Sequence, residues 1–298
     1  MLARLLRQII ATQLVFGAGV GAALVYWAEW HLWTPLASGL LMPLITMLLV
    51  DTVTAVKSRA KTESAGMWWR SLGGELLAGF QVFLLRQPWT TSAPVALPAT
   101  GPTPRIPVVL VHGYMCNQRI WDAMSAALRA NGHAVFALNL EPLFCSIDRY
   151  APTIESAVNT LCQQTGAQRV ALVGHSMGGL AIRAWMRAHG TGRVGRVLTL
   201  GTPHAGTQID PSTHTTNGKQ MCWQSDWLRD LAQSESDATR ALVHIALTPQ
   251  DNIVYPQRAQ VLAGVEPAVF EGIGHVQMCL DPLVIQWTTA QLSSVPLH

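Results

Sequence analysis

The sequence predicts an α/β fold in two parts: a mostly parallel sheet flanked by helices, preceded by a pair of transmembrane helices. Three observations predict it. The first 61 residues hold two long uncharged stretches, and from residue 107 onward short apolar runs alternate with segments of helical periodicity. One of these runs leads into a Gly-x-Ser-x-Gly motif at residues 174–178. Strands that alternate with helices are typical of a parallel sheet covered on both faces.

The composition agrees with a chain that has both membrane and globular parts. Of the 298 residues, 49% are hydrophobic and only 12% are charged, which is about half the usual charged fraction. This balance excludes intrinsic disorder, which requires low hydrophobicity and high charge. The net charge is only +3, with no long run of Lys or Arg, so we expect no nucleic-acid partner. The apolar excess indicates membrane segments beside a globular domain.

The apolar excess is concentrated in residues 1–61, which we interpret as a membrane anchor. Residues 9–28 and residues 32–50 are both free of charged residues, and Glu29 lies between the two runs. Each run can cross a hydrocarbon layer of roughly 30 Å as a helix. Gly17 and Gly21 suit close helix packing. The glycine string there only weakly resembles a dinucleotide-binding motif, because its last glycine position is alanine and no strand precedes it. A cleavable signal peptide has a single apolar core. A two-helix anchor therefore fits best. Aromatic residues typical of a membrane interface lie between the two runs: Tyr26, Trp27, Trp30 and Trp33.

Basic residues flank both ends of this anchor, with Arg4 and Arg7 before it and Lys57, Arg59 and Lys61 after it. The positive-inside rule places both ends in the cytoplasm. We expect residues 62–106 to form an interfacial helix, at residues 67–85, and a Pro-rich linker. If residues 67–85 instead crossed the membrane as a third span, the rest of the chain would be periplasmic.

Residues 107–298 are expected to form one domain. Its predicted strands and helices alternate: strands at residues 108–111, 134–140, 170–173 and 197–200, and helices at residues 120–130, 153–165 and 177–188. The strand runs are largely apolar, as in parallel strands buried on both faces. Residues 208–234 lack a clear period at first, and two interpretations remain equally open: a lid over a binding pocket, or an ordinary surface excursion.

The segment Gly174-His-Ser-Met-Gly178 lies between the predicted strand at residues 170–173 and a helix that begins near Met177. A sharp turn there exposes the Ser176 hydroxyl, and glycine at the flanking positions lets strand and helix approach closely. The start of the helix offers free N–H groups and the positive end of its dipole to a developing oxyanion. We therefore predict that Ser176 is a nucleophile.

An acid and a base follow Ser176 in the chain. Asp251 comes shortly after an apolar strand at residues 241–247, and loops at the carboxyl ends of strands hold the functional groups of such sheets. An Asx turn before Asn252 is the alternative role for Asp251. His275 ends the run 268–275, which reads as a strand followed by a glycine turn. We predict a catalytic triad of Ser176, Asp251 and His275.

Other candidates for the triad are weaker. His175 is expected to point away from the site and pack, His204 is a further competing base, and His112 is expected to shape a loop. Asp210 is the second candidate acid, although no strand directly precedes it. We expect no metal and no cofactor, because the five cysteines form neither a Cys-x-x-Cys pair nor a zinc-site spacing. They are Cys116, Cys145, Cys162, Cys222 and Cys279.

From about Ile106 to its end, the chain resembles the α/β-hydrolase superfamily and, within it, the bacterial lipase/esterase type. Three motifs carry the resemblance: the Gly-His-Ser-Met-Gly segment, Val-Leu-Val-His-Gly-Tyr at residues 109–114, and Gly-Thr-Pro-His-Ala-Gly-Thr at residues 201–207. The resemblance implies an eight-stranded, mostly parallel sheet and a triad in the order Ser, acid, His. It also implies an oxyanion hole formed by the backbone N–H groups of Tyr114 and Met177.

The residues and the resemblance together predict a serine hydrolase, anchored in a bacterial inner membrane, that cleaves carboxylic esters of lipids through an acyl-enzyme on Ser176. Two other functions remain open. One is an acyltransferase or thioesterase that uses the same triad; the other is a non-catalytic scaffold tethered to the membrane. Activity on a generic ester distinguishes an enzyme from a scaffold, and competition by an acyl acceptor distinguishes hydrolysis from transfer.

Overall fold

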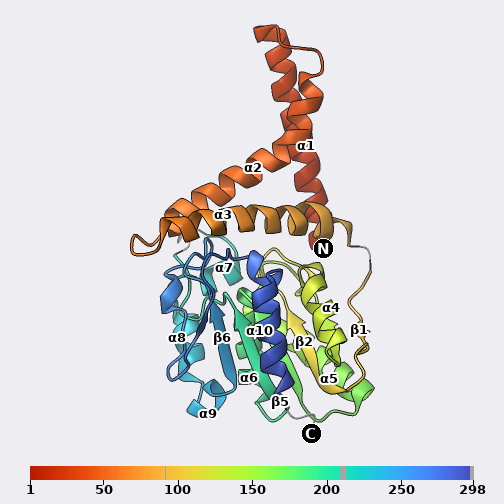
Figure 1. Ribbon diagram of the computed structural model, residues 1–298, viewed down its shortest axis with the longest axis vertical. Coiled ribbons are helices and arrows are strands. Elements are labelled where there is room, and N and C mark those ends of the chain that lie inside the picture. Colours follow the sequence, from red (N-terminus) through yellow and green to blue (C-terminus); the bar gives the residue numbers. More distant parts are fainter. Residues whose placement is uncertain (91, 209–212, 296–298) are drawn as a thin grey trace.

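The structure is a computed structural model that describes residues 1–90, 92–208 and 213–295. A sheet of seven strands forms the centre of the domain below the N-terminal helices (Figure 1). The strand order is β1-β3-β2-β4-β5-β6-β7, and all neighbours are parallel except β1 and β3. This mostly parallel sheet confirms the predicted fold class. The strands are β1 (Ala96–Leu97), β2 (Arg105–Val111), β3 (His133–Ala137), β4 (Val170–His175), β5 (Val194–Leu200), β6 (Val243–Leu247) and β7 (Ala268–Val269).

The sheet differs from the expectation in its strand number and its edge. The described residues form seven strands, not eight, and β1 lies inside the predicted linker, where Ala96 pairs with Phe136 of β3. The described residues before β1, 1–90 and 92–95, are mostly helical and provide no further strand. At two residues, β1 is too short to show an alternating pattern.

Helices cover both faces of the sheet, and alternate strand residues pack into two separate cores. Val109 and Val111 of β2 face a core formed with α5 (Ala151–Thr165) and α6 (Met177–His189). Val108 and Leu110 face the other core, formed with α4 (Asp122–Ala130) and α10 (Pro282–Ser293). All four β2 side chains are fully buried, which explains why the strand is apolar along this length. The described residues between β5 and β6 form three shorter helices: α7 (Thr216–Gln220), α8 (Asp226–Gln233) and α9 (Asp237–Arg240).

Helices α1 (Leu2–Ala28) and α2 (Thr34–Ser58) form a hairpin that projects from one end of this domain (Figure 1). By length and composition each can cross a membrane, with a mean hydropathy of 1.8 for α1 and 1.9 for α2. Gly17 and Gly21 are buried between them, and a Cβ atom on Gly17 would lie 2.5 Å from the carbonyl oxygen of Ser38. The expected close packing at these glycines is confirmed. Most large apolar side chains of the hairpin, such as Val15 (74% exposed), face outward.

Helix α3 (Ala65–Gly79) continues into a π-helical turn, Phe80–Arg86, and lies across the top of the domain that contains the sheet, below the hairpin (Figure 1). Its position agrees with the helix expected at residues 67–85. Both hairpin helices extend past the predicted spans 9–28 and 32–50 at the ends near the domain. There the N-terminal amino group of Met1 pairs with Glu141, so the start of α1 rests on the domain.

Candidate active site

Ser176 occupies a sharp turn between β4 and α6, as the motif predicts. Its backbone angles, φ 55° and ψ −129°, are strained for a residue with a side chain. A Cβ atom on Gly174 would lie 2.5 Å from the backbone nitrogen of Gly179, and one on Gly178 would overlap the carbonyl oxygen of Val111. Glycine at both positions is therefore required for the strand and helix to approach this closely.

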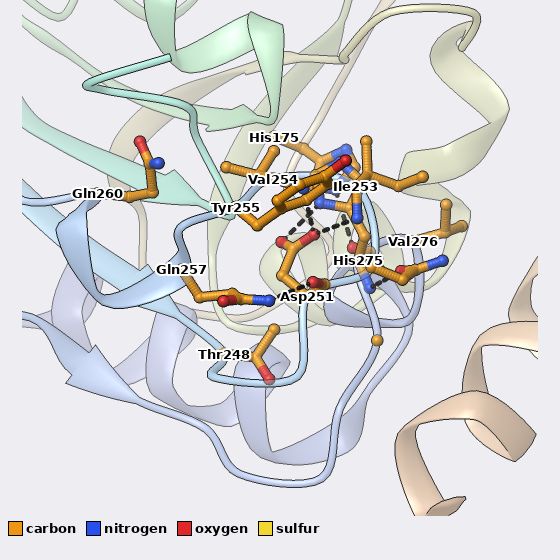
Figure 2. A network of polar contacts seen from close by, with 12 residues as sticks. His175, Thr248, Asp251, Ile253, Val254, Tyr255, Gln257, Gln260, His275 and Val276 are labelled. Atoms are coloured by element: carbon orange, nitrogen blue, oxygen red, sulfur yellow. Dashed lines mark hydrogen bonds and ion pairs between the residues drawn. The ribbon is translucent and has the colours of Figure 1, made fainter. Parts of the chain in front are cut away.

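His275 and Asp251 form a buried pair beside this turn. The Nδ1–H of His275 donates to Oδ2 of Asp251 at 2.7 Å, and the two residues are 4% and 2% exposed (Figure 2). Gly201, at the end of β5, packs against the pair: a Cβ atom there would lie 3.2 Å from each of these two atoms. The backbone N–H of Ser176 donates to the carbonyl of Leu200, the residue before Gly201, at 2.9 Å. The structure thus brings the three predicted triad residues together.

The other carboxylate oxygen of Asp251 fixes its own loop. Oδ1 accepts hydrogen bonds from the backbone N–H groups of Ile253 at 2.9 Å and Val254 at 2.7 Å (Figure 2). The Asx turn weighed as an alternative role is therefore present together with the histidine contact. Because one oxygen holds the turn and the other holds the imidazole, the carboxylate has a single orientation.

Further hydrogen bonds join the loop after β6 to the loop that carries His275. Thr248 donates from its hydroxyl to the carbonyl of Ile273 at 2.7 Å. The side-chain oxygen of Asn252 accepts from the backbone N–H of His275 at 3.4 Å. The two loops are fixed relative to each other, which positions the imidazole before any ligand binds.

The segment after β2 lies directly against Ser176. A Cβ atom on Gly113 would be 2.7 Å from Cβ of Ser176, so only glycine lets this backbone pass so near. Tyr114 follows and lines the same cavity as Ser176 and His275. Met177 is the first residue of α6, and the first-turn N–H groups of a helix have no partner within it. Both predicted oxyanion residues therefore lie beside the nucleophile.

Three other histidines, His112, His175 and His204, are buried and structural. His175 does not point away from the site as expected: its ring packs 4.6 Å from that of His275, and Nε2 bonds to the His275 carbonyl at 3.0 Å. The strand end and the histidine loop lie so close that they bring the rings together. His112 accepts from the N–H of Leu140 at 3.0 Å and shapes its loop, as expected. His204 instead bonds to Thr199 at 3.0 Å.

Burial lowers the pKa of all three of these histidines, to about 4 for His112. They are neutral at pH 7, and only His175 has its partner within the pair of Asp251 and His275, at the backbone carbonyl of His275. Asp210, the second candidate acid, lies outside the described residues. Of the predicted lid, the described residues 208 and 213–234 do not line the cavity at Ser176.

Glu75 is a site residue that the sequence did not reveal. This carboxylate of α3 is 3% exposed and accepts from the backbone N–H groups of Val276 and Gln277, both at 3.0 Å. It thereby fixes the two residues that follow His275. A single acid within an apolar helix could have indicated this role, because a buried carboxylate needs partners.

Two acidic side chains, Asp251 and Glu75, raise the pKa of His275. Burial opposes its protonation, but the charge and hydrogen bond of Asp251, with the charge of Glu75, outweigh burial and raise its pKa. Burial also raises the pKa of Glu75 to about 7, against the opposing effects of His275 and the two N–H donors. An imidazole with a raised pKa is a stronger base once it is deprotonated.

The sequence of the catalytic part matches that of a known family. A sequence model of the palmitoyl protein thioesterase family matches residues 107–260, which is about half of the chain and includes Ser176 and Asp251. The chain belongs to this family. His275, Glu75 and the hairpin all lie outside the matched region. The contact between Glu75 and the loop that carries His275 is therefore not covered by the family match.

Two curated relatives are triacylglycerol lipases. That of Burkholderia plantarii is 33% identical over 128 residues, and that of Pseudarthrobacter phenanthrenivorans is 34% identical over 114. The matched regions cover 40% and 35% of this chain, respectively. They cover 35% of the length of each relative. The matches therefore cover only part of the catalytic domain.

Solved structures share the fold. Lipase B of Aspergillus fumigatus superposes with a TM-score of 0.56 at 17% identity, over 68% of this chain and 57% of its own. The mature lipase BlEst2 of Bacillus licheniformis gives 0.57 at 18%, over 68% of this chain and 99% of its own. The sequence and structural matches together place this family member among α/β-hydrolases of the lipase/esterase type.

Proposed function

We propose that the chain is a membrane-anchored serine hydrolase that cleaves carboxylic esters of lipids through an acyl-enzyme on Ser176. The arrangement that carries this proposal is the strained turn at Ser176 beside the buried pair of His275 and Asp251, joined at 2.7 Å. Ser176 attacks the ester carbonyl while Nε2 of His275 takes its proton, and Asp251 stabilises the resulting imidazolium. Among the described residues beside Ser176, His275 is the histidine that is hydrogen-bonded to a carboxylate.

The oxyanion and the second half-reaction follow from the same geometry. The backbone N–H groups of Tyr114 and Met177 stabilise the negative charge on the former carbonyl oxygen. His275 gives its proton to the leaving alcohol, and the acyl group stays on Ser176. Water then loses a proton to His275 and attacks the acyl-enzyme, which releases the carboxylic acid and restores the Ser176 hydroxyl.

A thioester is the second candidate substrate, because the family match is to palmitoyl protein thioesterases. The steps are the same, with a thiol as the leaving group. Acyl transfer to an alcohol would also pass through the same acyl-enzyme, and added alcohol would then compete with water. A scaffold without catalysis would show none of these reactions.

Hydrolysis of matched oxoester and thioester substrates tests the proposal on the full-length protein in detergent. Ser176→Ala should lower kcat/KM by about 10⁴-fold or more, whereas Ser156→Ala, on the exposed face of α5, should not change it. Faster turnover of the thioester would favour the second candidate. Undiminished hydrolysis by Ser176→Ala would overturn the proposal.

We also propose that residues 1–61 anchor the catalytic domain, residues 107–298, to the cytoplasmic face of an inner membrane. Both ends of the hairpin contact the domain: the amino group of Met1 pairs with Glu141, and the side-chain NH₂ group of Gln257 donates to the carbonyl of Ser58 at 2.9 Å. The basic residues at both ends suit the cytoplasm. A fluorescent reporter fused to the C-terminus should be active, and an alkaline phosphatase fusion inactive; the reverse would place the domain outside.

A further inference from the structure

A cavity of about 540 Å³ lies between the hairpin and the catalytic domain. Ser176 and His275 line its end on the domain side, together with Tyr114. The opposite wall comes from the first helix, the second helix and the π-helical turn after α3. The volume lies within the range of roughly 300–1,000 Å³ that is typical of small-molecule sites. The hairpin therefore forms part of the pocket that holds the nucleophile.

The hairpin side of this cavity is mainly aliphatic. Ile9 and Ile10 of α1 line it, as do Met47 and Val50 of α2, and Phe83 contributes from the π-helical turn. An acyl chain has no polar group to satisfy, so such a wall suits it.

Most of the polar groups that line the cavity already have partners. Gln13 donates to the hydroxyl of Thr46 at 2.8 Å, and Glu75 is bound by two backbone N–H groups. Two lining residues are exceptions: Nδ1 of His175 and Oδ2 of Asp51 are both buried without a hydrogen-bond partner in the described structure. This oxygen is available to a hydroxyl group of a bound lipid.

The cavity lies where the two helices diverge. Farther from the domain, Gly17 and Gly21 hold α1 and α2 in close contact. Figure 1 shows the helices separating from there toward the domain. The hairpin residues that line the cavity fall within residues 6–13 and 43–51, between the contacts of these glycines and the domain. Ile9 is 39% exposed and Val50 is 59% exposed, although both line the cavity. The wall is therefore open to the surroundings of the hairpin, which in a membrane are lipid tails.

We propose that this cavity is the acyl-chain site and that an acyl ester of a membrane lipid enters it sideways from the bilayer, between α1 and α2. The proposal rests on the proposed function, since it places the acyl chain of the ester that Ser176 attacks. In this arrangement the anchor is itself a wall of the substrate site. The ester reaches Ser176 without leaving the membrane, and its acyl chain stays among the aliphatic residues of the hairpin.

Crosslinking tests the proposal on the unaltered full-length protein in phosphatidylcholine vesicles. The probe is a fluorophosphonate whose long alkyl chain carries a diazirine at its end. After the probe reacts, light should join the chain to peptides of α1 or α2 that contain residues 6–10 or 43–50. Reaction at Ser176 with crosslinks only to residues 208–234 or other parts of the domain would overturn the acyl-site proposal. No reaction at Ser176 would instead contradict the proposed function.

Substitutions that fill the cavity give a second test. Ile10→Trp and Met47→Trp should lower the ratio of kcat/KM for a palmitoyl ester to that for a butyryl ester by about tenfold or more, because the longer chain loses its space. Val15→Trp, on the outward face of α1, is the matched control and should leave this ratio unchanged. An unchanged ratio in both cavity variants would count against the proposal.

Discussion

The carboxylate of Glu75 on α3 accepts a hydrogen bond from the backbone N–H of Val276, a residue 201 positions later in the chain. Val276 directly follows His275, so a helix at the top of the catalytic domain fixes the loop that carries the predicted base. The second oxygen of Glu75 binds the N–H of Gln277 in the same way. Packing of the N-terminal helices and placement of the imidazole are thus physically connected.

Replacing Glu75 should change both stability and pH dependence. Glu75→Gln keeps one acceptor, but its NH₂ group faces a backbone donor, and an unsatisfied buried group costs about 1–3 kcal/mol. The variant should unfold at lower temperature. It also removes the negative charge that Glu75 carries as the pH rises through its pKa of about 7. That charge raises the pKa of His275, so the acid limb of kcat/KM should move to lower pH. Thermal unfolding and pH–rate profiles measure the two effects. Glu266→Gln, on an exposed loop, should change neither; equal behaviour of the two variants would refute the role of Glu75.

Asp251→Asn separates the two functions of that carboxylate. The amide oxygen can still accept from Ile253 and Val254, so the loop should keep its shape and the Tm should change little. Its NH₂ group cannot accept from His275, and a comparable change in a serine protease triad lowers kcat by about 10⁴-fold.

The same substitution predicts a shift in the pH profile. His275 acts only when neutral, so activity rises with pH through its pKa, which Asp251 and Glu75 raise above 6.5. The remaining activity of Asp251→Asn should therefore show its acid limb at lower pH than the wild type. Asp237→Asn, at an exposed helix start, is the control. A limb at the same pH in all three proteins would contradict this electrostatic account.

Gly113→Ala should damage the oxyanion segment without unfolding the protein. The new methyl group would lie 2.7 Å from Cβ of Ser176, and either the nucleophile or the segment with Tyr114 must move. Loss of one oxyanion donor lowers kcat by about 10²–10³-fold, and we expect a loss of this size. Gly192→Ala is the matched control, because a Cβ atom there meets nothing within 4 Å. Steady-state kinetics with a short-chain ester compares them, and equal kcat values would exclude the close approach.

The parts of the site that sequence predicts best are local ones. The turn at Ser176 depends on neighbours within a few residues, and the glycines on each side of Ser176 indicate it. Asp251 and His275 are recognisable because each follows an apolar run, and parallel strands bring their carboxyl ends to one edge. The prediction for Gly17 and Gly21 also rested on a spacing within one helix.

Contacts between distant segments could not be predicted in this way. Nothing near Glu75 indicates a partner at Val276, and nothing in the aliphatic run around Ile9 distinguishes a lipid-facing residue from a cavity wall. The edge strand at Ala96 forms only because β3 offers an unpaired edge, and its two residues carry no pattern. His175 is expected from the sequence to point away, and its contact with His275 could not be predicted because it depends on how the end of β4 meets the distant histidine loop.

The central claim, that Ser176 is the nucleophile, is tested most directly by mapping a covalent adduct. The full-length protein is treated with a fluorophosphonate, digested and analysed by mass spectrometry. The account predicts a single modified peptide with the adduct on Ser176, and none in Ser176→Ala. An adduct on another residue, or equal labelling of the Ser176→Ala protein, would contradict it.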